Sequence, residues 1–188
     1  MRIPTRAFVA TMVLAMVTSS CGYNRLQELD EQVNSSQAQI QTALQRRADL
    51  IENLVQTVKG VAAQESTIFI GVAEARSRLA GAAATGSLQE MAEADAAMRA
   101  PLGRLLAIAE AYPELKSAGN FTMLQDQLEG TENRIAVARN DYNASVEQFN
   151  AMIRRFPTVI TAKLFGLGKP REYFQASEGA AEVPRVQF

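Results

Sequence analysis

A seven-residue repeat in the C-terminal half of the sequence constrains the fold more than any other feature. One row of this repeat carries large apolar side chains, at Phe121, Leu128, Ile135, Tyr142, Phe149 and Phe156. A second, mostly smaller row runs beside it, at Leu124, Thr131, Ala138, Ser145 and Met152. Paired rows of large and small side chains are typical of a long helix that approaches other helices closely. We therefore expect the aromatic stripe to belong to a helical core.

The first half of the body shows a similar apolar pattern. Apolar or small side chains recur at heptad-related spacings from Leu26 to Leu79, and no proline lies between them. This predicts one very long helix, which ends in the glycine-containing stretch at residues 80–87. A second helix is expected from Ser87 to Tyr112, with Ser87 and Glu90 as a capping box. The predicted fold class is therefore all-α, an elongated up-and-down helical bundle of three to four helices.

Pro101 lies inside the expected middle helix, where it should produce a kink or a break. A straight middle helix would start the last long helix partway along the first and leave residues 26–44 bare, which is unfavourable. A break at Pro101 would let residues 121–156 run antiparallel to the first helix and cover most of its apolar face. We expect that antiparallel arrangement.

The N-terminal sequence has the order of a secretory signal. Arg2 and Arg6 precede the apolar run Phe8–Val17, and small residues then lead to Cys21. The run would form a helix of about 15 Å, against about 30 Å of hydrocarbon to cross, so a retained membrane span is the weaker interpretation. The order resembles a bacterial lipoprotein signal, in which the cysteine is lipidated. The alternative is an ordinary signal or an uncleaved anchor with an incidental cysteine.

This interpretation divides the chain into a signal peptide at residues 1–20, a helical bundle at 21–165, and an irregular C-terminal tail at 166–188 that packs on or near the bundle. The body would lie outside the cytoplasm in the cell envelope, on the periplasmic side, with a lipid anchor in the membrane. Gly22, rather than the aspartate that typically retains lipoproteins in the inner membrane, slightly favours the outer membrane in a cell that has one.

Composition excludes several classes of function. The chain has no histidine, which removes the usual general base and the commonest metal ligand. Its one cysteine allows neither an internal disulfide nor a thiolate metal site. The net charge of −1 does not favour nucleic-acid binding. We expect no catalytic residue, no cofactor and no metal site.

Charged side chains interrupt both long helical segments. Arg47 falls on or beside the packed face, because it lies between the apolar positions Leu44 and Ile51. One interpretation is a charged layer inside the bundle that pairs the first and last helices and fixes their register. The other is a partner-binding surface rimmed by arginine. The residues singled out for either role are Arg46, Arg47, Asp49, Glu132, Arg139 and Asp141.

The short stretch after Pro157 offers a second surface. Ile160, Leu164 and Phe165 would allow contact with a membrane, although tertiary packing explains the same residue types.

Several stretches resemble the LemA family, in order along nearly the whole body. They are "YNRL" from Tyr23, "QRRADLIENLVQTVKG" from Gln45, "EAR" from Glu74, "AEAYPELK" from Ala109, "NFTMLQDQLEGTENRIAVARNDYN" from Asn120, "RRFP" from Arg154, "YF" from Tyr173 and the terminal "VQF". The resemblance implies a small helical-bundle envelope protein without established enzymatic activity. Some relatives accompany membrane proteases, and one branch is tied to magnetosome membranes.

Three departures from the family pattern matter. Glu52 replaces a common proline, which favours a straighter first helix. Gln64 stands where the family has histidine, and a lipoprotein-like signal replaces the usual membrane span. We expect a membrane-anchored helical scaffold or interaction protein with an unidentified envelope protein as partner. The alternative is an adaptor or regulator of an envelope membrane protease.

Overall fold

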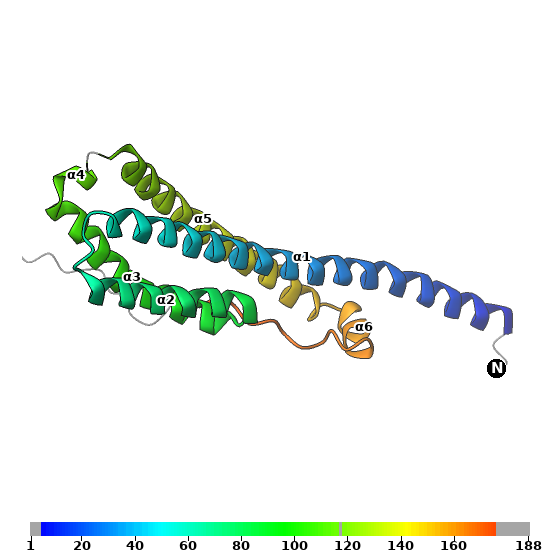
Figure 1. Cartoon of the computed structure of the whole chain (residues 1–188). Coiled ribbons are helices and arrows are strands. Elements are labelled where there is room, and N and C mark those ends of the chain that lie inside the picture. Colours follow the sequence, from blue (N-terminus) through cyan, green and yellow to red (C-terminus); the bar gives the residue numbers. More distant parts are fainter. Residues whose placement is uncertain (1–4, 117, 176–188) are drawn as a thin grey trace, which may run out of the picture. The chain divides into compact units, whose positions relative to one another are not determined.

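A computed structural model describes residues 5–116 and 118–175, with side chains at 22–115 and 118–175. Within these residues the chain forms helices and no strands, which confirms the all-α fold class (Figure 1). The predicted signal peptide and the side chain of Cys21 lie outside the described side chains. Among the described residues, no helix combines the length and apolar character needed to cross a lipid bilayer. The helices are α1 (Thr5–Lys59), α2 (Ser66–Thr85), α3 (Leu88–Ala111), α4 (Pro113–Lys116), α5 (Gly119–Met152) and α6 (Thr158–Leu164).

The described chain divides into two compact units. The terminal unit comprises the chain up to Ser36 together with Asp141–Tyr173, and the bundle unit comprises Gln37–Asn140 together with the chain from Phe174. Helices α1 and α5 each supply one part to either unit.

Helices α1 and α2 run antiparallel in the bundle unit. The side chain of Gln37 donates a hydrogen bond to the carbonyl oxygen of Gly86, and Arg76 forms a salt bridge with Glu52. Residue numbers thus fall along α2 as they rise along α1. The short link at residues 86 and 87 then returns the chain into α3, which packs against α2.

Helix α5 also runs antiparallel to α1 in the bundle unit. Arg47 forms a salt bridge with Glu132, while Leu50 and Asn53 line one groove together with Gln127. The antiparallel arrangement of α1 and α5 was predicted. It was expected to follow from a break at Pro101, but a different part of the chain produces it.

The core of the bundle unit is built from all four long helices. A fully buried aliphatic side chain contributes roughly 1.5–3 kcal/mol relative to an exposed one. The largest fully buried side chains of the bundle unit are Ile40, Leu44, Ile51, Leu54, Leu79, Met91, Met98, Leu105 and Ile135.

The prediction of one helix through residues 26–79 was wrong, because the chain turns between Lys59 and Ser66. Gly60 has a low helix propensity, and the amide of Ala62 bonds back to the carbonyl of Val58 at 2.9 Å. The turn buries Ala62 completely. Folding back here allows α2 to cover α1, which one long helix would leave uncovered.

Pro101 does not divide the middle helix, so the predicted break was wrong. Proline removes the bond that its amide would make to the carbonyl of Ala97, four residues earlier. Ala97 is exposed, so water can reach this part of α3, and the neighbouring residues Ala100 and Gly103 are small and exposed. The reversal of chain direction therefore comes from the turn after Lys59. Ser87 caps α3 as predicted, because its hydroxyl accepts a hydrogen bond from the amide of Glu90. The Glu90 carboxylate, which the capping box would place on the Ser87 amide, instead accepts a hydrogen bond from the Thr85 hydroxyl.

Gly86 ends α2 in a left-handed conformation, with φ of 72°. A Cβ here would also lie 2.9 Å from Nε2 of Gln41. We expect Gly86→Ala to lower the free energy of unfolding by about 1–2 kcal/mol, because a side chain strains this backbone conformation. The matched control is Gly81→Ala inside α2, where no heavy atom lies within 4 Å of the added Cβ. That variant should gain roughly 0.5–1 kcal/mol. Urea unfolding measures the free energy of unfolding of both variants. Changes of the same sign in the two variants would contradict the strain expected at Gly86.

In the terminal unit, α1 packs against α5 and α6. Leu26 and Val33 of α1 and Phe149 of α5 are buried, and the hydroxyls of Ser36 and Ser145 lie 3.0 Å apart. The small side chains at this contact allow close helix approach, as the smaller row of the repeat indicated.

The predicted aromatic stripe is buried at all its positions except the last. Phe121, Tyr142 and Phe149 are core residues, but Phe156 is 82% exposed. The reason is that α5 ends at Met152, so Phe156 no longer follows the helical repeat. Its assignment to the core was wrong.

Candidate functional site

A cluster of charged side chains is buried inside the bundle unit. Asp95 on α3 is 1% exposed and holds an arginine on each carboxylate oxygen. Its Oδ1 lies 2.7 Å from a guanidinium nitrogen of Arg47 on α1, and its Oδ2 lies 2.8 Å from one of Arg139 on α5. Arg47 also pairs with Glu132, whose side chain is half-exposed. Three helices are thus joined at one level by two cations and two anions.

The charged side chains of the cluster are closely paired, but two of their nitrogen atoms have unused hydrogen-bonding capacity. The guanidinium of Arg139 lies 4.7 Å from the centre of the Phe174 ring, a favourable cation–π distance. The Nε atoms of Arg47 and Arg139 are buried and have no hydrogen-bond partner among the described residues. Desolvation of such groups opposes the gain from pairing, so the net contribution of the cluster to stability is smaller than its number of ion pairs suggests.

The sequence supplied Arg47, Glu132 and Arg139, which the structure brings together. Asp95, which joins them, was missed. A signal for it exists, because Asp95 interrupts an apolar series with spacings of four and three residues. The series contains Met91, Asp95, Met98, Leu102 and Leu105, all of them buried. A charge on the apolar face of a helix needs a buried partner of opposite sign.

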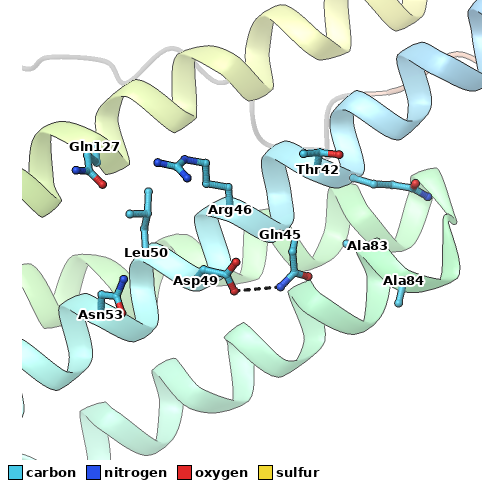
Figure 2. Close-up of a pocket in the computed structure, with 10 residues that line it drawn as sticks. Thr42, Gln45, Arg46, Asp49, Leu50, Asn53, Ala83, Ala84 and Gln127 are labelled. Carbon is cyan, nitrogen blue, oxygen red and sulfur yellow. Dashed lines mark hydrogen bonds between the residues drawn. The ribbon is translucent and has the colours of Figure 1, made fainter.

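Arg46, Asp49 and Asp141 do not belong to the buried cluster, because all three are exposed. Arg46 and Asp49 instead line an open groove of about 640 Å³ in the bundle unit. In Figure 2 the Arg46 side chain extends from α1 towards Gln127 on α5, and a hydrogen bond joins Gln45 to Asp49.

The groove is rich in side chains that donate or accept hydrogen bonds. Its lining residues are Gln41, Thr42, Gln45, Arg46, Asp49, Leu50, Asn53, Ala83, Ala84 and Gln127. The two alanines of α2 leave space on one side. Amides and hydroxyls of this kind match the backbone groups of a peptide segment. No group of side chains suited to holding a metal ion occurs among the described residues.

The position that departs from the family histidine has a polar contact of its own. Nε2 of Gln64, in the turn between α1 and α2, lies 2.5 Å from the hydroxyl oxygen of Tyr112 after α3. Tyr112 belongs to the family-like stretch that begins at Ala109, so the glutamine that replaces the family histidine contacts one of the family's motifs.

The terminal unit holds the chain after α6 by hydrogen bonds from α5. Asn150, which is buried, donates to the carbonyl of Arg171 at 2.9 Å and accepts from its amide at 2.8 Å. The Tyr142 hydroxyl donates to the carbonyl of Glu172 at 2.9 Å. Burial raises the pKa of this tyrosine above its usual value, with Arg171 opposing that shift and Glu172 adding to it.

Comparison with known proteins places the chain in a family. The sequence profile of the LemA family matches residues 36–188. Magnetosome proteins MamQ 2 and MamQ 1 of Paramagnetospirillum magneticum are each 28% identical over 203 aligned positions, which cover 96% of this chain and 71% of the relative. Magnetosome protein MamQ of Magnetospirillum gryphiswaldense is 28% identical over 210 positions, which cover 97% and 76%. Since the profile match includes α2, α3, α5 and the C-terminal part of α1, and well over half of the residues, this chain belongs to the LemA family.

Proposed function

We propose that this protein is a membrane-anchored helical scaffold of the bacterial cell envelope that holds a protein partner and catalyses no reaction. The observation that carries the proposal is the groove around Arg46. In the bundle unit, Arg47 and Arg139 form internal ion pairs with Asp95, whereas Arg46 lines an open polar groove. A rigid helical surface with exposed polar groups suits protein binding.

Family membership supports the same role. Resemblance to LemA proteins implies an envelope protein without established enzymatic activity, and relatives of this chain are named magnetosome proteins. The absence of histidine from the sequence removes the usual general base, which also argues against hydrolytic chemistry. The partner would be an envelope protein that places a polar segment in the groove.

Membrane attachment through Cys21 is the second part of the proposal. The order of Arg2, Arg6, the apolar run and Cys21 supports a lipoprotein signal. We expect Cys21→Ser to leave the precursor unprocessed or to release the protein from membranes, because the lipid attachment site is lost. Cell fractionation and mass spectrometry of the purified protein measure this. A mature protein that retains an intact, unmodified Met1–Cys21 segment would exclude lipid anchoring.

Crosslinking in intact cells tests the partner site. A photo-crosslinking residue at Asn53, which lines the groove, should capture an envelope protein. The same residue in place of Arg99, which is exposed on α3 outside the groove, should not. Arg46→Ala should reduce the capture from position 53, since it removes the cation over the groove, while the melting temperature stays unchanged.

Two outcomes would contradict the partner site. One is equal capture from positions 53 and 99, and the other is capture that Arg46→Ala leaves unchanged. The identity of the captured protein refines the role further. A protease whose turnover changes in the Arg46→Ala strain would make the scaffold an adaptor.

A further inference from the structure

Helix α6 has an inverted distribution of side chains. Its buried residues are Thr158, Thr161 and Ala162, whereas Ile160 and Leu164 are 59% and 77% exposed. Large aliphatic side chains normally lie inside a folded domain and threonines at its surface. Tertiary packing, which the sequence favoured as the explanation of these residue types, therefore does not account for Ile160 and Leu164.

Exposed aromatic side chains flank the helix on both sides. Phe156 precedes α6 and Phe165 follows it at 56% exposure. We call these four side chains, Phe156, Ile160, Leu164 and Phe165, the α6 surface. Four large exposed apolar residues within ten positions are more than the scattered single residues found on ordinary surfaces.

Along the chain, the charged residues next to the α6 surface have one sign. Arg154, Arg155, Lys163 and Lys169 are exposed, and residues 154–170 contain no aspartate or glutamate. A protein partner of unspecified charge would not require this excess. Apolar side chains surrounded by cations are the pattern that binds an anionic bilayer, where the apolar groups enter the interface and the cations meet lipid phosphates.

The α6 surface also lies beside the start of the described side chains of α1. The rings of Phe165 and Tyr23 are 4.6 Å apart between centroids, and a Cβ on Gly22 would lie 3.5 Å from the Thr158 hydroxyl. Gly22 directly follows Cys21, the proposed attachment point. An anchor at Cys21 would therefore bring α6 to the membrane surface without any intervening linker.

We propose that the α6 surface docks on an anionic lipid bilayer, so that the protein has a second membrane contact besides its N-terminus. The proposal rests on the proposed membrane attachment. Docking at two points restricts how the terminal unit is oriented on the membrane, because a single lipid chain leaves a protein free to rotate.

The absence of tryptophan from the sequence allows a direct test with the full chain. The protein is reconstituted into vesicles of phosphatidylethanolamine and phosphatidylglycerol, with or without bromine on the acyl chains. Phe156→Trp places a single emitter on the α6 surface. Ile70→Trp is the matched control, since Ile70 is 59% exposed on α2. Bromine should quench emission from position 156 and leave emission from position 70 unchanged.

Vesicle flotation separates this proposal from membrane attachment itself. Protein that floats with the vesicles but shows no quenching at position 156 is attached without docking, which overturns the inference and leaves the anchor intact. Protein that does not float refutes both. Quenching at both positions indicates general adsorption and overturns the assignment to α6. A blue shift at position 156 that depends on protein concentration without lipid would identify a second copy as the occupant and overturn the lipid proposal.

Charge and apolar variants test the chemistry of docking. Arg154→Gln and Lys163→Gln should each lower the ratio of docked to undocked protein roughly fivefold on anionic vesicles. Added salt should reduce docking in the same direction. Leu164→Ser should weaken docking with unchanged far-ultraviolet circular dichroism, because the side chain it shortens is exposed. Docking that is the same on uncharged vesicles, or that persists in all three variants, would overturn the proposal.

Discussion

Replacing Asp95 with alanine is expected to lower the free energy of unfolding by about 3–5 kcal/mol, the cost of leaving buried charges without their partner. Asp95 is almost wholly buried and holds both Arg47 and Arg139. Its removal would leave two guanidinium groups facing each other inside the bundle unit. Chemical denaturation followed by circular dichroism measures the loss.

Two controls separate burial from charge in this experiment. Glu132→Gln removes the half-exposed anion of the same cluster, so its cost should be about 1 kcal/mol or less. Asp95→Asn keeps the shape of the side chain and some hydrogen bonding while it removes the charge, and its cost should fall between the two. A similar loss for Asp95→Ala and Glu132→Gln would show that burial does not decide the energy of the cluster.

An apolar replacement of the cluster tests whether it stabilises the fold or specifies the alignment of the helices. The triple variant Arg47→Met, Asp95→Leu, Arg139→Leu should regain most of the stability lost in Asp95→Ala, since it also removes the unpaired Nε atoms. If the cluster fixes the register, the triple variant should show broadened side-chain signals in NMR spectra. A stable triple variant with sharp, native-like spectra would exclude a register role.

The spacing of apolar residues predicted the class of fold but not the point at which the first helix turns. Ala62 and Phe69 lie seven residues apart and are both buried, so the repeat continues through the turn as it would through a helix. Only Gly60 marks the site, and glycine also occurs within α2 and α3, where the helix continues. Periodicity reports which residues face a core, and here both conformations satisfy it.

The rule that an internal proline breaks a helix failed at Pro101, and the reason lies in the surroundings of the helix. A proline disrupts a helix through one missing amide and one steric conflict, and both become tolerable where the helix faces water and its neighbours are small. Exposure of Ala97 decides the outcome, and exposure is a tertiary property. The buried charges show the same limit. Arg47 was placed at the packed edge by its spacing, but its partner on α3 depended on which helices meet.

In α6 the structure differs most from what the residue types suggest, because threonines are buried and aliphatic side chains are exposed. The same residue types fit a small core or a lipid-facing surface, because the hydrophobicity of a side chain does not show whether protein or lipid surrounds it. The structure excludes the core interpretation for Leu164, because it exposes this side chain and buries Thr158 and Thr161. Several large apolar residues exposed at one place on a folded unit are typical of a surface that contacts a partner or a membrane.

The chain after α6 offers the last large effect. Asn150 forms hydrogen bonds with both the amide and the carbonyl of Arg171, as a neighbouring strand would. The sequence around Asn150 did not distinguish it from the other asparagines. We expect Asn150→Ala to destabilise the attachment of residues 166–173 by about 2–3 kcal/mol, since two hydrogen bonds are lost and their backbone partners are left unpaired. Amide hydrogen exchange across this segment should accelerate by roughly 30-fold or more.

Two variants show whether the backbone pairing or the arginine side chain holds this segment. Arg171→Ala removes the salt bridge to Asp30 but leaves both backbone bonds to Asn150 in place. Because that salt bridge is partly exposed, its loss should cost about 1 kcal/mol or less and accelerate exchange only a few-fold. Gln148→Ala, an exposed neighbour on α5, should change nothing. Exchange that accelerates more in Arg171→Ala than in Asn150→Ala would assign the attachment to the guanidinium and reject the asparagine as its main contact.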